Sequence, residues 1–400
     1  MSPGPSLGRA TDRVLPSAEW WSGKAAQKVM EALEGKAWFV GGGVRDALLG
    51  QPVTDVDIAT LWASRAMQKR FRDRGLWCYL TGRRLGTMTV ERGDWSAQVT
   101  PVQAHPGEPR DARADAFRRD FTINTLVADR EGRIHDPVER GLADLRAGRV
   151  RFVVDPGVSL REDPVRLIRF LRFQAIYGRI PPNPETTEAC RRAANSLLPK
   201  AEPFRVGLML QKLVGCSQAV KALELAEQFG AMGSLLPRPD IPALQALLTE
   251  VPDADWRQRL AVLLSPGDVK RVFVRYAWPQ DDRIHVEVLH NLVYGRPATV
   301  AAILQRRSHE ILAEALPIAR ALERKEALTL LGALDEHEGS VPHRRFPLKR
   351  RHIAALGWDE ENAVLVRAAL KDHWIASGRT MDRFELLDLA ERWQAEGLPA

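Results

Sequence analysis

The sequence predicts a fold in two parts: an α/β head, with a small mixed sheet and helices, followed by an all-α remainder. Three observations lead to this prediction. Strand, glycine-turn and helix signals alternate in the first part of the chain. From Ser159 onward strand signals nearly vanish, and apolar residues recur at helical spacing. Finally, 400 residues with 45% apolar content can bury more than one core. We place the boundary near residues 153–159.

The head begins with a helix, a strand and a glycine turn in close succession. Trp20–Leu33 is amphipathic and is followed by Gly35, which is typical of a helix and its end. The apolar run Ala37–Val40 predicts a buried strand that leads into three glycines. The next two segments predict a short helix and then a half-buried strand: Val44–Leu49 and Thr54–Thr60.

The rest of the head predicts a basic helix, more strands and a hairpin. The helix lies near Ser64–Arg74, and the hairpin turns through Glu131 and Gly132. Between them we expect three strands and then a loop: Leu76–Thr81, Gly86–Glu91, Trp95–Thr100 and Pro101–Asp115. Proline-rich breaks divide the helical remainder near residues 181–184, 237–242 and 342–347.

The charge balance favours a polyanionic partner. Lys and Arg number 58 against 51 Asp and Glu, which gives a formal net charge of +7 and a pI near 9.5. Thirteen arginines and no lysine lie between Arg118 and Arg179. A planar guanidinium suits phosphate and base recognition. Codon bias toward arginine is a partial alternative explanation.

The chain carries no signal for secretion, membrane insertion or disulfide bonding. Residues 1–16 contain no apolar core of a signal peptide, and no run of eighteen apolar residues occurs. The cysteines, Cys78, Cys190 and Cys216, form no CxxC pair, which argues against a disulfide framework and a zinc site. We expect a cytoplasmic protein with no membrane partner.

Asp55 and Asp57 are candidates for binding a metal ion. They lie two residues apart on a predicted strand, so both carboxylates should project from one face. Two like charges this close repel each other, and a divalent cation removes the conflict. Mg²⁺ takes one or two carboxylates together with substrate phosphates. Two such ions can stabilise the attacking and leaving oxygens of a phosphoryl displacement.

The glycines before the short helix suggest the other half of a nucleotide site. Gly41 and Gly42 have no Cβ, so a triphosphate could approach the backbone N–H groups at the start of the helix. Arg45 lies in the first helical turn and could contact a phosphate. A glycine cluster alone more often marks a tight turn. Joined to the Asp55–Asp57 pair, it points to a nucleoside triphosphate.

A second cluster, "RRDFTINTL", covers residues 118–126. Its two arginines offer a phosphate clamp, and Asp120 offers an acceptor for a ribose hydroxyl. The Asn124 amide can bridge sugar and phosphate. The alternative is a charged loop whose residues pair with one another.

The third cluster, "REDPVRLIRFLRF", covers residues 161–173. Pro164 fits the first position of a helix and leaves Asp163 as the N-cap, which would be a purely structural role. However, three arginines recur along one face of that helix: Arg166, Arg169 and Arg172. Asp163 and Arg166 together present an acceptor and donors in the plane of a base. They would select the exocyclic amino group of C or A and reject U and G.

In this order, "GGGVRDALLG", "TDVDIAT", "FRRDFTINTLVAD" and "REDPVRLIRFLRF" resemble class II tRNA nucleotidyltransferases, the family of CCA-adding enzymes and bacterial poly(A) polymerases. The resemblance is strong over residues 37–180 and fainter near the C-terminus, at "FPLKRRHIAALGW". It implies an α/β nucleotidyltransferase head, then an all-α neck, body and tail that hold the tRNA acceptor end. We assign the parts as follows: a disordered segment at 1–20, the head at 21–155, a neck with the nucleotide-selecting helix at 156–225, and body and tail at 226–400.

The resemblance also implies a role for each matching residue. Asp55 and Asp57 would be catalytic and would bind Mg²⁺. The other candidates would bind the nucleotide. Those at the triphosphate and primer side are Gly41, Gly42, Arg45 and Asp46, and those at ribose and phosphate are Arg119, Asp120 and Asn124. Asp163 and Arg166 would contact the base, Glu162 would orient these two residues, and Arg169 would be a further contact.

Two departures from the family pattern bear on the reaction. Gln98, in "AQVTP", stands where family members commonly have an acidic residue, which puts a third active-site carboxylate in doubt. The sixteen residues Val102–Phe117 are fewer than the long loop of full CCA-adding enzymes, and CC-adding members lack that loop. We therefore predict an enzyme that adds CC from CTP and leaves the terminal A to a separate enzyme.

Three alternatives stay open. The first is a complete CCA-adding enzyme that also uses ATP. A poly(A) polymerase is the second, and a non-catalytic RNA-binding relative, supported only by Gln98, is the third. Two basic segments, residues 305–309 and 343–352, could contact the tRNA backbone or could be solvated helix flanks.

Overall fold

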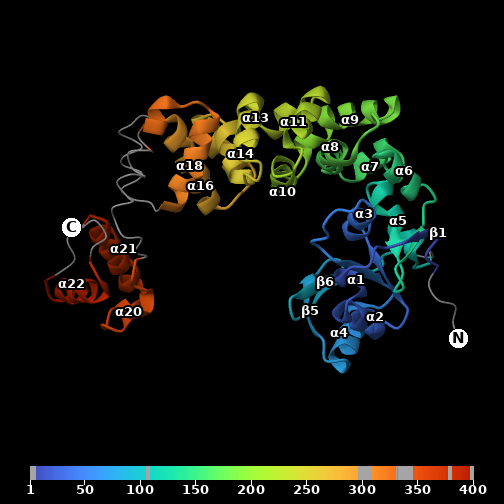
Figure 1. Cartoon of the computed structure of the whole chain (residues 1–400), viewed down its shortest axis with the longest axis horizontal. Coiled ribbons are helices and arrows are strands. Elements are labelled where there is room, and N and C mark those ends of the chain that lie inside the picture. Colours follow the sequence, from blue (N-terminus) through green and yellow to red (C-terminus); the bar gives the residue numbers. More distant parts are fainter. Residues whose placement is uncertain are drawn as a thin grey trace. The chain divides into compact units, whose positions relative to one another are not determined.

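The structure is a computed structural model of the chain (Figure 1). It describes residues 6–104, 109–295, 309–329, 331, 346–376 and 381–396. The chain divides into two compact units, Met1–Leu235 and Leu236–Ala400. The predicted two-part fold is confirmed, because every named strand of the described residues lies at or before Asp136 and regular structure after that point is helical.

The head is built on a mixed sheet of eight strands in the order β1-β8-β7-β2-β3-β6-β5-β4. Neighbouring strands are antiparallel except β3 and β6, which run parallel. The strands are β1 (Arg9–Val14), β2 (Ala37–Val40), β3 (Asp57–Thr60), β4 (Trp77–Gly82), β5 (Thr87–Arg92), β6 (Trp95–Pro101), β7 (Val127–Ala128) and β8 (Arg133–Asp136). Each predicted strand is present, and the predicted hairpin joins β7 to β8.

Strand β1 corrects the prediction that residues 1–20 are disordered. Arg9 and Ala10 pair with β8, and the Thr11 hydroxyl donates to the Ile134 carbonyl at 2.9 Å. The segment RATDRV has no apolar alternation, so its sequence carries no strand signal of its own. It becomes a strand because the outer edge of β8 offers unpaired backbone groups.

The helices of the head differ from the prediction at two places. The predicted helix Trp20–Leu33 is divided at Gly23, whose backbone is extended, into α1 (Glu19–Ser22) and α2 (Lys24–Ala32). Within the predicted loop Pro101–Asp115, Asp111 caps a short helix by accepting from the Ala114 N–H at 2.8 Å. The other elements are α3 (Gly42–Leu48), α4 (Ser64–Asp73), α5 (Ala112–Phe117), the 3₁₀ turn η1 (Thr122–Asn124) and α6 (Gly141–Ala147).

The neck helices belong to the same compact unit as the head. They are α7 (Pro156–Glu162), α8 (Arg166–Tyr177), α9 (Pro184–Ser196), the 3₁₀ turn η2 (Leu198–Lys200), α10 (Pro203–Val214), α11 (Ala219–Gln228) and α12 (Met232–Leu235). Phe121 of the head packs against Phe170 and Phe173 of α8, with ring centroids 6.1 and 5.1 Å apart. The unit ends at Leu235, beyond residue 225, where we placed the end of the neck.

The described part of the second unit is helical. Its helices are α13 (Ile241–Glu250), α14 (Trp256–Leu263), α15 (Pro266–Arg275), α16 (Gln280–Tyr294), α18 (His309–Ala321), α20 (Arg350–Ala354), α21 (Glu360–Ala376) and α22 (Arg383–Glu396). The last three share an apolar cluster that includes Ile353, Val366 and Leu386. Among the described helices, none combines the length and apolar character needed to span a bilayer. Of the two basic segments, residues 305–308 and 343–345 lie outside the described residues, whereas residues 346–352 are described and lead into α20.

Candidate active site

The three sequence motifs meet at one cavity of about 400 Å³ in the first unit. This volume is ordinary for a small-molecule site. The lining residues are Gly41, Gly42, Arg45, Asp57, Arg118, Arg119, Asp120, Asn124, Asp163, Arg166, Arg169 and Phe173. Of the predicted site residues, Asp46, Asp55 and Glu162 lie outside this lining.

Gly41 makes the sharp turn from β2 into α3. Its backbone, at φ 75° and ψ −134°, adopts a conformation that is essentially restricted to glycine. A Cβ atom there would lie 3.1 Å from Arg119 Nη1 and 3.6 Å from Asp57 Oδ2. Arg119 is held in place by Asp115, with Nη2 and Oδ2 2.7 Å apart. Gly41 thus lets the chain turn where a guanidinium and a carboxylate converge.

The two aspartates differ in position, which corrects part of the prediction. Strand β3 starts at Asp57, so Asp55 lies in the preceding connection and is exposed. Val40 pairs with Asp57, and β2 then turns away at Gly41, so β3 has no antiparallel partner before Asp57. Only Val56 extends the strand contacts, by accepting the Gln98 N–H at 2.8 Å.

The charge of Asp57 is poorly compensated by the protein. Burial raises the pKa of this carboxyl, Arg119 offsets part of the effect, and Asp55 and Asp115 raise the pKa further. Among the described residues, no hydrogen bond or ion pair to the Asp57 carboxylate is present. The site therefore fits a divalent cation, which would favour the ionised form.

Asp55 and Asp57 are the residues that would hold such an ion. Among the described residues, no group of three or more His, Cys, Asp or Glu side chains is arranged to bind a metal. Additional ligands would have to come from substrate phosphates or water, as is usual for Mg²⁺. Gln98 is the in-register neighbour of Asp57 on β6 and is exposed. An amide therefore lies beside Asp57 at the position where family members commonly have an acidic residue.

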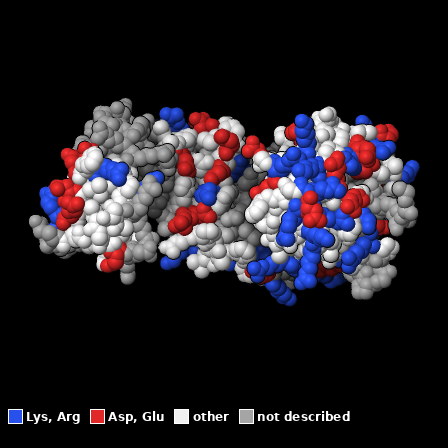
Figure 2. Space-filling view, turned by 90° about the horizontal axis from the view of Figure 1, so that it is seen from below, with Lys and Arg blue, Asp and Glu red and all other residues white. Residues whose placement is uncertain are grey.

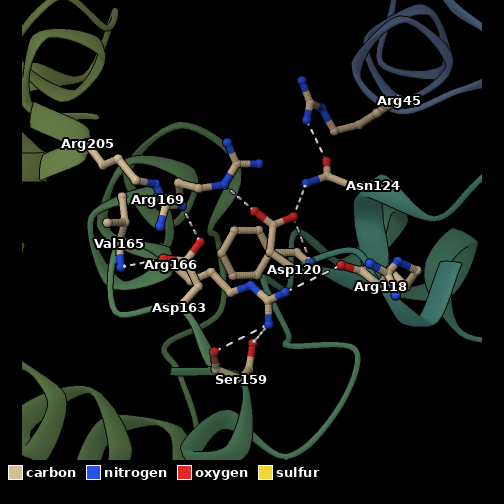
Figure 3. Close-up of polar contacts among 11 residues, drawn as sticks. Arg45, Arg118, Asp120, Asn124, Ser159, Asp163, Val165, Arg166, Arg169 and Arg205 are labelled. Atoms are coloured by element: carbon tan, nitrogen blue, oxygen red, sulfur yellow. Dashed lines mark hydrogen bonds and ion pairs between the residues drawn. The ribbon is translucent and has the colours of Figure 1, made fainter. Parts of the chain in front are cut away.

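A hydrogen-bond network joins η1 to α3 and α8 (Figure 3). Asp120 accepts from Asn124 Nδ2 at 3.0 Å and from Arg169 Nε at 2.5 Å. Asn124 Oδ1 accepts from Arg45 Nη1 at 2.6 Å. The remaining Arg45 nitrogens, Nε and Nη2, each donate to Asp46 at 2.8 Å. All three nitrogens have protein partners, so Arg45 braces the site, and its predicted contact with a phosphate stays a prediction.

Asp120 and Tyr177 show how strongly this network fixes protonation. Burial alone would raise the pKa of Asp120, but Arg169, Asn124 and the Phe121 N–H together lower it. Burial raises the pKa of Tyr177 to about 12, so its hydroxyl stays protonated and donates to Asp46 at 3.1 Å. The predicted ribose acceptor Asp120 therefore has both carboxylate oxygens occupied by protein donors.

Asp163 and Arg166 lie where α7 gives way to α8 (Figure 3). Asp163 Oδ1 accepts from the Val165 N–H at 3.2 Å, but Val165 and not Asp163 holds the N-cap position of α8, so the predicted helix start at Pro164 is wrong. Its Oδ2 accepts from Arg205 Nη2 at 2.7 Å. Arg166 Nη1 donates to Ser159 Oγ at 2.8 Å and to Glu162 Oε2 at 3.0 Å. Glu162 therefore contacts Arg166, and its predicted role in orienting the base-selecting pair stays a prediction.

Sequence reasoning missed three residues that support this site: Ser159, Tyr177 and Arg205. Arg205 lies in the first turn of α10, 42 positions after Asp163, whose carboxylate it contacts. No local pattern marks it, because a single arginine near a helix start is ordinary. Tyr177 ends α8 with its ring 4.3 Å from the Arg45 guanidinium carbon. Its spacing of four from Phe173, another ring near Arg45, was the available signal.

Positive charge gathers on the surface of the first unit. In the space-filling view of Figure 2, Lys and Arg side chains are dense over the part of the chain that forms head and neck, with a few acidic side chains among them. Such a surface suits a polyanion. It agrees with the arginine excess found between Arg118 and Arg179.

Comparison with known proteins supports the resemblance. Residues 37–151 match the poly A polymerase head domain. Poly(A) polymerase I of Haemophilus influenzae is 30% identical over 266 residues, which cover 61% of this chain and 57% of that protein. A CCA-adding enzyme of Leuconostoc mesenteroides is 32% identical over 240 residues, covering 56% of this chain and 58% of that protein. The chain thus matches just over half the length of these curated relatives.

The fold also has solved counterparts. The crystal structure of the Bacillus stearothermophilus CCA-adding enzyme in complex with CTP aligns with a TM-score of 0.65. The alignment covers 94% of this chain and 98% of that chain, at 22% sequence identity. At this identity the likeness establishes the shared fold.

Proposed function

We propose that this chain is a class II tRNA nucleotidyltransferase and that it adds nucleotides to the 3′ end of tRNA without a nucleic-acid template. The match of residues 37–151 to the poly A polymerase head domain and the similarity to CCA-adding enzymes support the proposal. The single observation that carries the proposal is the shared cavity of about 400 Å³. Gly41, Asp57, Asp120 and Asp163 come from four segments far apart in the sequence, and all line it.

In this proposal Asp55 and Asp57 hold Mg²⁺, and in its more specific version they hold two Mg²⁺ ions. When bound, Mg²⁺ supplies charge neutralisation at the phosphates of the nucleotide and at the attacking and leaving oxygens. The raised pKa of Asp57 supports this role, because the carboxylate gains its full charge most readily beside a cation. The Gly41 turn leaves room near the backbone for the triphosphate.

The neck side of the cavity would bind and choose the nucleotide. Arg119 and Arg169 lie at the cavity with positive charge toward the phosphates and ribose, and the Asp120 network holds Arg169 in place. Asp163 and Arg166 would pair with the edge of the incoming base. Selection arises because a base that leaves these half-buried donors and acceptors unpaired binds less well.

The finer form of the proposal is CC addition from CTP. It rests on the short segment Val102–Phe117 and assigns the terminal A to a separate enzyme. Two other outcomes have support of their own. CCA-adding relatives favour complete CCA addition, and relatives named poly(A) polymerase I, at 30 to 33% identity, favour ATP tailing.

One assay separates these activities. Labelled tRNA lacking its 3′ CCA is incubated with Mg²⁺ and CTP, ATP or both, and the products are sized at single-nucleotide resolution. Two added nucleotides that ATP cannot extend support CC addition, and a third with ATP supports CCA addition. Long tails with ATP alone identify a poly(A) polymerase. No extension by the wild type under any condition, with the Asp57→Asn variant as the blank, would refute nucleotidyl transfer.

A further inference from the structure

The sheet carries Asp57 in a row that continues to its outer strand. Asp57 on β3 is in register with Gln98 on β6, Gln98 with Thr89 on β5, and Thr89 with Tyr79 on β4. Residues in register on neighbouring strands project from the same face of a sheet. Four strands at a spacing of about 4.8 Å place Tyr79 roughly 14 Å from Asp57 along this row.

The two faces of these strands have opposite character. The adjacent row of Ile58, Val99 and Met88 is buried to 2% exposure or less, and it belongs to the core. The row of Asp57, Gln98, Thr89 and Tyr79 is polar and at least partly exposed at every position. We call this second surface the open face. Because alternation is strict, the open face is the surface that also presents Asp57.

Two large aromatic side chains stand on the open face without a protein covering. Trp77 is 70% exposed and Tyr79 is 42% exposed. Trp77 is in register with Glu91, two residues from Thr89, so it shares the face with Tyr79. The Tyr79 hydroxyl donates to Glu91 Oε1 at 2.7 Å, which orients the ring. Single exposed apolar residues are common, but packing does not explain two exposed rings on the face that also presents Asp57.

We propose that the open face binds the single-stranded 3′ end of the RNA acceptor, with bases stacking on Trp77 and Tyr79 while the terminal hydroxyl lies near Asp57. The inference rests on the proposed function in taking an RNA end as the substrate. Aromatic rings are sequence-tolerant platforms for unpaired bases. The exposed Arg83 and Arg84, in the turn that follows the end of β4, add positive charge near this strand for the RNA phosphates.

The observations favour RNA over a protein partner. β4 is the outer strand of the sheet, and its edge could pair with a strand of another chain. However, Trp77 and Tyr79 project from the face and not along the edge, and the row of Tyr79 leads to Asp57. A protein partner on this face would lie across the approach to the cavity. An RNA strand there would instead deliver its own end.

A double-mutant cycle between protein and RNA tests the proposal. The ligand is an acceptor-stem hairpin with a single-stranded 3′ overhang, prepared with normal or abasic nucleotides behind the terminal residue. Trp77→Ala/Tyr79→Ala should weaken binding of the normal RNA by about 30-fold or more, because each lost base stack is worth about 1–3 kcal/mol. The same variant should bind the abasic RNA as the wild type does. Leu80→Ala is the matched control, because Leu80 is 50% exposed on the same strand but faces the opposite way.

The readouts separate this inference from the proposed function. Binding is measured without nucleotide, so coupling between the rings and the overhang bases would support the open face even if no transfer occurred. If the wild type extends tRNA but the double variant binds and extends it equally well, the open-face inference is overturned and the proposed function stands. Equal losses on normal and abasic RNA, or a loss of self-association with RNA binding intact, would also overturn it.

Discussion

The Asp55–Asp57 pair and the Asp120 network line neighbouring parts of the first unit, and they handle negative charge in opposite ways. Asp120 is 7% exposed and receives hydrogen bonds from Arg169, Asn124 and the Phe121 N–H. Its pKa is lowered despite burial. Asp57 has a raised pKa, and Asp55 adds to the repulsion. A carboxylate that the protein neutralises fully is part of the framework, whereas one left uncompensated is available to an external cation.

The largest effect is expected from a substitution of Asp57. Asp57→Asn should reduce nucleotide transfer to labelled tRNA by about 1000-fold or more, because the charge that holds the cation is gone. The free energy of unfolding should stay the same or rise, since a repelling charge is removed. Affinity for tRNA should change little, because phosphate contacts dominate it.

Mg²⁺ titration provides the matching control for this variant. The wild type should show a rise in melting temperature on adding Mg²⁺, through binding to the folded state alone. Asp57→Asn should lose that rise. Near-normal turnover in the variant, or an unchanged Mg²⁺ response, would exclude the metal-binding role of Asp57.

Asp120→Asn should have the opposite signature. The amide keeps the shape and can still accept from Asn124 and Phe121, but Arg169 loses its charge partner. We expect a loss of about 3 kcal/mol in the free energy of unfolding, at the low end for a broken buried pair because the Arg169 side chain is 32% exposed. Urea denaturation measures this loss. An equally stable variant would mean that the network does not hold the framework.

Arg205 extends the comparison, because it donates to the Asp163 carboxylate as Arg169 donates to that of Asp120. Arg205 is 55% exposed, so Arg205→Ala should change the free energy of unfolding by less than about 1 kcal/mol. It should nevertheless reduce the preference for CTP over UTP by about tenfold, because Asp163 loses its orientation. The ratio of kcat/KM for the two nucleotides is the measurement. Arg205→Lys should recover part of the preference, and an unaltered ratio in Arg205→Ala would remove Arg205 from nucleotide selection.

The sequence predicted the inner strands of the head well, and it missed what depends on distant partners. Ala37–Val40 was predicted with the observed ends, because an apolar run before glycines has few other solutions. Strand β1 was missed because its polar sequence forms a strand only against β8. The predicted helix Trp20–Leu33 overlooked Gly23, which breaks it locally.

Within the site, residue types were predictable, but hydrogen-bond partners were not. The pattern of Asp55 and Asp57 pointed to charge repulsion; burial is the main cause of the raised pKa of Asp57, and Asp55 adds to it. Arg45 appeared able to reach a phosphate, since nothing in the local sequence indicates that Asn124, 79 positions away, would engage it. Arg205 escaped notice for the same reason. Long-range pairs follow from the packing of head on neck, which periodicity does not encode.

The pH dependence of stability is the smallest expected effect, and its sign separates the two regions. Because the pKa of Asp120 is lowered, its contribution to the free energy of unfolding is complete above about pH 3.9, the pKa of an unfolded carboxyl group. That contribution is lost as the pH falls through the pKa of the folded state. The raised pKa of Asp57 means the reverse: its protonated form stabilises the fold below about 3.9, and that stabilisation is lost as the pH rises through the folded value. Without Mg²⁺, the advantage of wild type over Asp120→Asn should therefore shrink on acidification, measured by urea unfolding across pH 3 to 7. The advantage of Asp57→Asn over wild type should shrink over the same acid range. If acidification changed the free energies of unfolding of Asp120→Asn and Asp57→Asn in the same direction relative to wild type, the two carboxylates would not be in opposite electrostatic settings.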